Sequence, residues 1–287
     1  MRGLFALLAV LTTVFAAPQP AAAIAGGEDA RTGAYAFSVL LTMTGLPADG
    51  GGTRDSSCSG ALIAPRWVIT AGHCFRDASG DRVSRTVAEQ TTAIIGRTDV
   101  QSDAGYEVTV VDVHQADHTD VALAELADPV TGITPIPLAT ASPTGGEVLR
   151  LTGFGLLGDG TPARRMQTGL FTVGHVDPVT LEASGRSPRP DTSPCPHDSG
   201  GPYFREKPLA LVAVVSTGPG CPHPGPDYSA RVDNLTDWIT DTTADRPLPS
   251  YALAAAALLA VVLAAVSRPL LRTAGVDRGL SSPAARR

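Results

Sequence analysis

The stretch Cys195-Pro196-His197-Asp198-Ser199-Gly200-Gly201-Pro202 decides how the rest of the sequence is interpreted. A serine between an aspartate and two glycines is typical of the nucleophile of a covalent hydrolase. The glycines let the backbone turn tightly and leave room for a substrate carbonyl. Asp, Ser, Gly and Pro are also common turn residues, so an ordinary surface turn explains this stretch equally well when it is taken alone.

Two motifs upstream favour the hydrolase, because each places a chemically suitable side chain beside a strand-like run. Thr70-Ala71-Gly72-His73-Cys74 ends an apolar run over residues 61–69, and Asp120 leads into an alternating run over residues 121–126. An imidazole can take the proton of a serine hydroxyl, and a carboxylate can orient that imidazole. The order His, Asp, Ser along the chain is one of the known orders of such triads.

On these three motifs the chain resembles a serine protease of the trypsin/chymotrypsin family over residues 24 to about 240. The matching segments are Ala-Gly-His-Cys at 71–74, Asp-Val-Ala-Leu at 120–123 and Asp-Ser-Gly-Gly-Pro at 198–202. The resemblance implies an all-β fold of two antiparallel β-barrels with a C-terminal helix and the active site between the barrels. It also implies a serine endopeptidase with the catalytic residues His73, Asp120 and Ser199.

The resemblance further implies an oxyanion hole made by the backbone N–H groups of Ser199 and His197. Glycine is usual at the second position, and a side chain there restricts left-handed backbone torsions. Three outcomes follow: a competent hole at a small strain cost, a hole that forms only when substrate binds, or an impaired enzyme. Our hypothesis from the sequence is the second.

The same resemblance assigns the pocket for the P1 residue, the substrate residue whose carbonyl is attacked. It places Ser193 at the base of the pocket, and Ser216 and Gly218 on the wall that pairs with the substrate backbone. Because Ser193 carries no charge, we expect an uncharged P1 residue. Asp191 and Asp227 are close enough in sequence to change this, although acids at such positions are more often loop residues.

The N-terminus predicts export. Arg2, an apolar run over residues 4–17 and Ala21-Ala22-Ala23 have the layout of a signal peptide over residues 1–23. Export favours disulfides among the four cysteines, for which the sequence allows three pairings. A zinc site is the competing reading, but paired C-x-x-C units are missing. The family resemblance implies the pairs Cys58–Cys74 and Cys195–Cys221.

Cleavage after Ala23 would leave a chain that begins Ile24-Ala25-Gly26-Gly27, similar to the start of activated family members. The resemblance implies that the α-amino group of Ile24 then folds inward and pairs with Asp198. Such pairing is physically reasonable, since a buried carboxylate is costly unless a cation meets it. We hypothesise that signal peptidase itself exposes Ile24; a start at Pro18 would instead indicate a propeptide.

Short strand-like runs separated by turns occupy most of the region between these motifs, without a helix-length amphipathic segment in its first half. The strands expected in the first barrel cover residues 36–42, 59–70, 92–96, 106–113 and 120–126, with a glycine-rich loop at 47–55. A proline-rich crossing at 128–144 leads to a second barrel that includes strands at 147–155 and 209–215. A helix is expected at 232–240.

The end of the sequence predicts a membrane anchor after a protease domain at residues 24–241. A polar linker at 242–250 precedes an apolar run at 251–267, which is at the short limit for a membrane span. The arginine-rich segment 268–287 favours a cytoplasmic tail and therefore an extracellular protease domain. A buried core helix is the alternative for the apolar run. A lipid-anchor signal fits poorly because polar residues follow it.

Charge and motif content limit the remaining function classes. The net charge is −6 and no basic stripe is present, so nucleic acid is not an expected partner. We expect a protein or peptide substrate, membrane attachment through the C-terminal helix, a monomer, and no metal or cofactor. A pseudoprotease that only binds is the main alternative, favoured by His197 and the altered pocket. An esterase of another fold is disfavoured because Gly-x-Ser-x-Gly is absent around Ser199.

Overall fold

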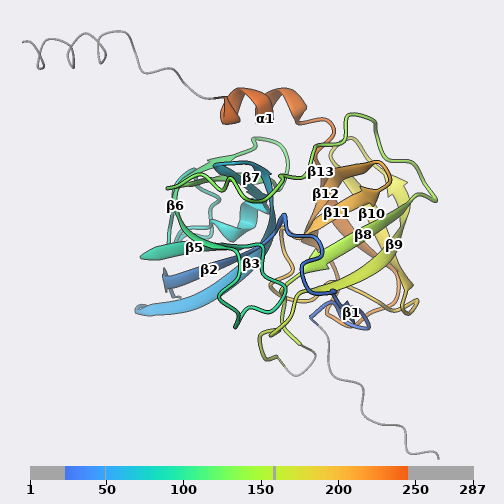
Figure 1. The fold of residues 1–287 in the computed structure, drawn as a ribbon, viewed down its shortest axis with the longest axis horizontal. Helices are drawn as coiled ribbons and strands as arrows, with labels where there is room; N and C mark the ends of the chain where they lie inside the picture. Colours follow the sequence, from blue (N-terminus) through green and yellow to red (C-terminus); the bar gives the residue numbers. More distant parts are fainter. Residues whose placement is uncertain (1–22, 49, 158–159, 245–287) are drawn as a thin grey trace, which may run out of the picture. The chain divides into compact units, whose positions relative to one another are not determined.

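The computed structural model describes residues 23–48, 50–157 and 160–244, which form two β-barrels and a C-terminal helix (Figure 1). The predicted anchor and tail, nearly all of the predicted signal peptide and most of the linker lie outside the described residues. The expected all-β fold of two antiparallel barrels with a closing helix is confirmed.

Six antiparallel strands close the first barrel, in the order β2-β3-β4-β7-β6-β5. They are β2 (Ser38–Pro47), β3 (Thr53–Ala64), β4 (Trp67–Thr70), β5 (Gln90–Ile95), β6 (Tyr106–Gln115) and β7 (Ala122–Leu126). Strand residues alternate between the two faces of a sheet, so apolar residues at every second position fill the interior. In β6, for example, Val108 and Val110 are buried while Glu107 and Thr109 are exposed.

The second barrel is a ring of six strands with a short seventh strand at one side. The ring consists of β8 (Val148–Gly153), β9 (Gln167–Val176), β10 (Thr180–Ser187), β13 (Pro226–Arg231), β12 (Leu209–Thr217) and β11 (Pro202–Glu206). β8 pairs with β9 to close the ring, and β1 (Glu28–Asp29) pairs with β9. Phe171 and Tyr203 pack edge-to-face in its core.

The structure differs from the expected elements at three places. The run at 59–70 is two strands, because the chain turns at Pro65, which has no N–H for a strand ladder. The glycine-rich loop is shorter than expected, since β2 and β3 extend into it. The helix α1 (Thr236–Thr243) begins four residues later than expected, because the Val232 N–H still bonds to the Val212 carbonyl of β12 and a turn from Val232 to Leu235 follows.

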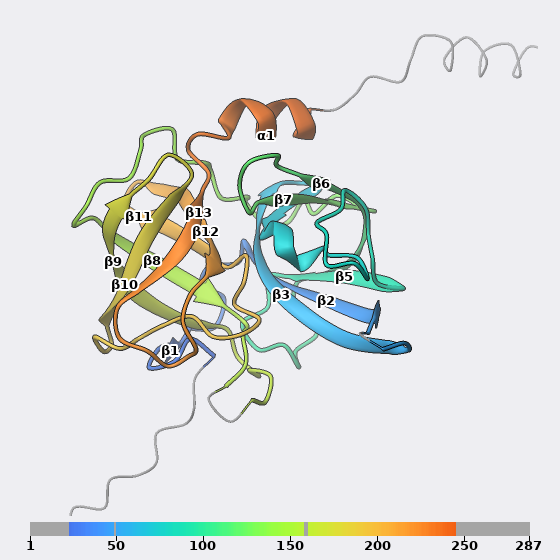
Figure 2. The ribbon, with the colours of Figure 1, turned by 180° about the vertical axis from the view of Figure 1, so that it is seen from behind.

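The two barrels share apolar contacts at their junction. Phe37, just before β2, packs edge-to-face on Phe204 of β11 with ring centroids 5.2 Å apart. Ile239 of α1 joins the same buried cluster, and α1 crosses one end of the barrels (Figures 1 and 2). In the described part of the chain, no helix has the length and hydrophobicity that a membrane crossing requires.

Candidate active site

His73 lies in a short 3-10 turn, Gly72–Cys74, directly after β4. The disulfide between Cys74 and Cys58 of β3 ties this turn to the barrel. The backbone N–H of His73 donates to Asp120 Oδ1 at 2.8 Å. The main chain of His73 is therefore held by contacts with β3 and with Asp120.

Asp120 reaches His73 because of strand register. It stands two residues before β7, whose first residue, Ala122, pairs with Thr70 at the end of β4. Neighbouring antiparallel strands thus bring the residue before β7 beside the turn after β4. The pairing of β4 with β7 therefore places the carboxylate of Asp120 beside the imidazole of His73.

Ser199 belongs to the second barrel, in the loop that leads into β11, and is fastened to the first barrel. Its carbonyl oxygen accepts a hydrogen bond from the Ser59 N–H of β3 at 2.8 Å. Gly200 has φ +81°, and a Cβ there would lie 2.1 Å from Thr70 Oγ1 and 2.4 Å from the Ser59 carbonyl oxygen. Only glycine fits this approach of the two barrels.

These three side chains form one hydrogen-bonded line. His73 Nδ1 lies 2.6 Å from Asp120 Oδ2, and His73 Nε2 lies 2.8 Å from Ser199 Oγ. Burial alone would raise the pKa of Asp120, but hydrogen bonds from His73 and Ser216 and the charge of the imidazole outweigh it and lower the pKa to about 2. Asp120 is therefore a carboxylate at neutral pH, able to hold the imidazole in one tautomer.

Two further residues near Asp120 were not assigned to it from the sequence. The Ser216 hydroxyl, at the end of β12, donates to Asp120 Oδ2 at 2.7 Å. The Arg82 guanidinium donates to the Thr119 carbonyl and has a nitrogen 3.9 Å from Asp120 Oδ1. No local pattern indicates either contact, because Ser216 comes from the other barrel and Arg82 from a loop.

His197 has a left-handed backbone. Its φ is +76°, in the left-handed region that favours glycine. Its Nδ1 lies 2.6 Å from the Ser57 hydroxyl, and burial together with the charge of Arg54 lowers its pKa, which favours a neutral ring. Within the described residues, the N–H groups of His197 and Ser199 have no intrachain acceptor. This favours a preformed hole over our hypothesis that substrate must induce it.

Asp198, between His197 and Ser199, is fully buried. It accepts hydrogen bonds from the N–H groups of Cys195 at 2.9 Å and Gly155 at 2.8 Å. A Cβ on Gly153 or Gly155 would come within 2.1 or 2.6 Å of its carboxyl group, so two glycines make its cradle. Burial and, to a smaller extent, the charge of Asp227 raise the pKa of Asp198 to about 8, against two hydrogen bonds that lower it.

Ile24 is buried in the core of the second barrel, and the following residue, Ala25, forms a β-bridge with Ser193. The start of the domain is thus packed close to the loops of the site. The pairing of an Ile24 α-amino group with Asp198 stays a prediction.

A pocket of about 230 Å³ lies beside Ser199 and contains parts of the expected substrate-binding wall. Ser216 and Gly218 line it, and the disulfide Cys195–Cys221 forms part of its boundary. Ser193 does not line it: its hydroxyl accepts a hydrogen bond from the His223 N–H, and the residue is fully buried. Asp227, which the sequence suggested was an ordinary loop acid, lies in β13 and does line the pocket.

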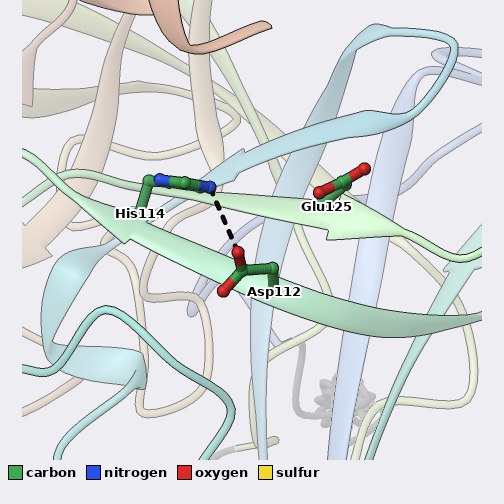
Figure 3. Close-up of side chains that lie close together, drawn as sticks. All are labelled: Asp112, His114 and Glu125. Carbon is green, nitrogen blue, oxygen red and sulfur yellow. Dashed lines mark ion pairs between the residues drawn. The ribbon is translucent and has the colours of Figure 1, made fainter. Parts of the chain in front are cut away.

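A cluster of ligand-type side chains elsewhere on the first barrel is shown in Figure 3. Asp112 and His114 of β6 and Glu125 of β7 place one polar atom each within 4.8 Å of one another. Asp112 pairs with His114 at 3.5 Å, while the Arg66 guanidinium lies 3.8 Å from Glu125. Because a cation already neighbours Glu125, we interpret the cluster as surface ion pairs. The expectation of no metal or cofactor stays a prediction.

Comparison with known proteins agrees with this geometry. The trypsin family model matches residues 24–239, so the chain belongs to the trypsin family, and its domain is a serine endopeptidase domain. It is 28% identical to mouse serine protease 56 over 78% of this chain and 39% of that protein. It is 30% identical to rat transmembrane protease serine 9 over 79% of this chain and 23% of that protein. The chain therefore spans well under half the length of these relatives.

Solved structures show the same fold. An HL collagenase structure matches with a TM-score of 0.62 and 24% identity, over 77% of this chain and 99% of that one. Neuropsin, a serine protease from mouse brain, matches with a TM-score of 0.60 and 20% identity, over 76% of this chain and 99% of that one. At these identities the likeness establishes the fold alone.

Proposed function

We propose that the domain hydrolyses peptide bonds through an acyl-enzyme formed on Ser199. His73 takes the hydroxyl proton as Oγ attacks the scissile carbonyl, and gives that proton to the leaving amine. Asp120 keeps the imidazole in the required tautomer and stabilises its cation. Water, activated by His73, then releases the second product and restores Ser199. The observation that carries this proposal is the line from Asp120 through His73 to Ser199 Oγ.

A fluorophosphonate probe tests the proposal directly, because it labels a serine only where base and oxyanion hole both function. We expect labelling of the wild-type ectodomain at Ser199 and none after His73→Ala. A folded ectodomain that is never labelled would instead favour the pseudoprotease. The line of hydrogen bonds and the left-handed His197 favour the active enzyme.

We place the oxyanion hole at the N–H groups of His197 and Ser199, and predict that the imidazole of His197 is dispensable. Since φ is already +76°, His197→Gly should keep the acylation rate within about threefold of wild type. His197→Val should lower the rate about 10- to 100-fold, because a β-branched residue resists this torsion and strain of this kind costs about 1–3 kcal/mol.

Burst-phase hydrolysis of an activated ester measures these acylation rates. Ser57→Ala is the matched control, since it removes the partner of the imidazole and leaves the backbone of residue 197 unchanged. A tenfold or greater gain in His197→Gly would show that the native hole is not preformed.

We also propose that the chain is exported and anchored in the cell membrane as a single-pass protein, with the protease outside. The support is the sequence pattern at residues 1–23 and 251–287, together with the relative described as a transmembrane protease. A monomer acting on protein or peptide substrates stays our expectation.

Fractionation of cells that express the whole chain tests the anchor. We expect the protease in the membrane fraction, resistant to alkaline carbonate, because a span of apolar residues is held by the bilayer core. A chain that ends at Thr243, the last residue of α1, should be released in soluble form. Recovery of both chains in the same soluble fraction would contradict the anchor.

A further inference from the structure

An arginine lies beside the carboxylate end of the catalytic line. Arg82 belongs to the loop between the turn Gly72–Cys74 and β5, and it takes no part in the chemistry proposed above. Its guanidinium donates a hydrogen bond to the Thr119 carbonyl oxygen, and one of its nitrogens lies 3.9 Å from Asp120 Oδ1. A cation therefore neighbours the residue that orients the imidazole of His73.

The hydrogen bond to Thr119 acts on the main chain that carries Asp120. Thr119 is 8% exposed, and within the described residues the Arg82 guanidinium is the one group that donates to its carbonyl oxygen. A buried carbonyl group without a donor is costly, so this bond favours one orientation of the peptide between Thr119 and Asp120. Arg82 thereby holds the backbone directly before the catalytic carboxylate.

The loop that carries Arg82 is supported by the first barrel. Its two arms are joined by an antiparallel bridge between Arg76 and Arg82, and by the Val83 N–H, which donates to the Phe75 carbonyl oxygen at 3.0 Å. Phe75 is buried in the core of the barrel. The side-chain amide of Gln115, in β6, donates to the Val83 carbonyl oxygen at 3.3 Å. The backbone beside Arg82 is therefore held by the barrel on which Asp120 lies.

Gly72 lets the guanidinium come close to the catalytic line. An added Cβ at Gly72 would lie 2.7 Å from Arg82 Nη1 and 3.1 Å from Asp120 Oδ1. A larger residue beside His73 would therefore displace the cation or the carboxylate. The approach of Arg82 depends on a glycine in the same turn that carries the base.

The charges around the catalytic line differ in their exposure to water. A cleft of about 650 Å³ beside His73 is lined by the charged or titratable residues Arg76, Arg82, Asp117, His118 and Asp120. Arg76, Asp117 and His118 are exposed, whereas the side chain of Arg82 is only 27% exposed. The residues of β12 on this cleft, Ser216 and Thr217, are neutral. Because water and salt screen exposed charges, the charge of Arg82 acts on the line more strongly than the others.

We propose that Arg82 is a positioning residue of the catalytic line, which orients Asp120 through Thr119 and extends the activity to lower pH by its charge. A nearby cation disfavours a second positive charge, so Arg82 opposes protonation of His73 in the free enzyme. The imidazole then stays neutral, and able to act as a base, at a lower pH. The proposal rests on the proposed function, since it concerns the same hydrolysis.

Arg82→Gln tests the charge, because it removes the cation and keeps a side-chain amide that can donate. We expect the midpoint of the acid limb of kcat/KM to move up by about 0.5–1 pH unit, the size of one lost charge near a partly exposed site. Arg82→Lys keeps the charge and should stay within about 0.2 unit of wild type. An unchanged midpoint in Arg82→Gln would contradict the charge effect.

Arg76→Gln is the matched control for the position of the charge. It removes the same charge from the same loop, but Arg76 is exposed and donates to the Gly80 carbonyl oxygen. Its midpoint should stay within about 0.2 pH unit of wild type, since water screens the lost charge. An equal shift in Arg76→Gln and Arg82→Gln would show that net charge sets the midpoint, and would reject the role of Arg82.

Arg82→Ala tests the contact with Thr119. On the plateau of the pH profile, we expect kcat to fall about 3- to 10-fold and KM to stay within about twofold, because the orientation of Asp120 affects the chemical step. Arg82→Lys should recover most of the lost kcat, since an ammonium group also donates to a carbonyl oxygen. Thermal unfolding of the variants controls for the fold. A plateau kcat of Arg82→Ala equal to that of wild type would reject the positioning role.

NMR follows the protonation of His73 without turnover. In Ser199→Ala protein, the Cε1–H signal of His73 is assigned by its loss when His73→Ala is added. The midpoint at which this signal moves with pH should rise by about 0.5–1 unit when Arg82→Gln is added instead. A midpoint that does not move rejects the charge effect of Arg82, whether or not a fluorophosphonate labels the wild-type enzyme. An unlabelled wild type with the expected NMR shift rejects the proposed function and supports the charge effect.

Discussion

Ser199→Ala is expected to lower kcat for peptide hydrolysis by about 10⁴- to 10⁶-fold, because the acyl-enzyme cannot form without the hydroxyl. His73→Ala should lower kcat by a comparable factor, since Oγ then has no base 2.8 Å away. KM should change much less, because the pocket wall that includes Ser216 and Gly218 stays in place in both variants. Active-site titration and steady-state kinetics on the purified ectodomain measure both effects.

The double variant sharpens this prediction. When two residues act as one unit, removing the first already abolishes most of the rate enhancement that the second supports. The double variant Ser199→Ala, His73→Ala should therefore have a kcat within about tenfold of that of the slower single variant. Thermal unfolding of all three variants controls for the fold. Multiplication of the two single losses would show that the residues act independently.

A free α-amino group at Ile24 is expected to raise kcat/KM by about 100-fold or more over a chain that keeps Ala23. Asp198 is fully buried, its pKa is raised to about 8, and no cation pairs with it among the residues that the structure describes. An ammonium group at Ile24 would pair with it and stabilise the adjacent loop, including the His197 N–H, in the conformation that the structure shows. Loss of one oxyanion donor costs about 10²- to 10³-fold in kcat.

The two chains should also differ in the pH range over which they lose stability. In the uncut chain Asp198 has a raised pKa, so the folded state binds more protons than the unfolded state and the free energy of unfolding falls as pH rises from about 4 to 8. In the cut chain the paired ammonium has a pKa above its reference value of about 7.7–8.0, so its stabilising effect is present below that range and lost at higher pH.

Urea unfolding at pH 5 and pH 8 measures this difference, with Ser199→Ala in both chains to prevent self-digestion. Asp198→Asn in the uncut chain is the control and should remove most of its pH dependence. N-terminal sequencing of the exported protein then shows whether cells make the Ile24 end. Equal activity of the two chains would reject the pairing.

The sequence alone predicted the fold and the three catalytic candidates, because the short motifs at 71–74, 120–123 and 198–202 carry the resemblance to the family. Alternating apolar residues predict strands whatever their neighbours are, and His73 and Ser199 sit in distinctive short motifs. The ends of elements were less certain: Pro65 divides one expected strand in two, and the backbone hydrogen bond of Val232 to β12 delays the helix.

The parts of the site that could not be predicted depend on contacts between distant segments. Ser216 reaches Asp120 across 96 residues of sequence, from the other barrel. The sequence identified Asp227 only as an acid close to the pocket residues. Its burial, and the lack of a hydrogen-bond partner for its Oδ2 among the described residues, depend on the pairing of β12 with β13. His197 is a further case, because a histidine at a glycine position gives no indication of the φ that it adopts.

The hydrogen bond between Ser59 and Ser199 has a consequence for thermal inactivation of the enzyme. Ser199 belongs to the second barrel, and its carbonyl oxygen accepts a hydrogen bond from Ser59 of the first barrel. Asp120 belongs to the first barrel, and its carboxylate accepts a hydrogen bond from Ser216 of the second barrel. A small displacement of one barrel against the other would therefore disturb both Ser199 and Asp120, the two ends of the hydrogen-bonded line. Loss of turnover during heating should therefore precede, or coincide with, the first melting of either barrel, and no half-melted molecule should retain partial activity.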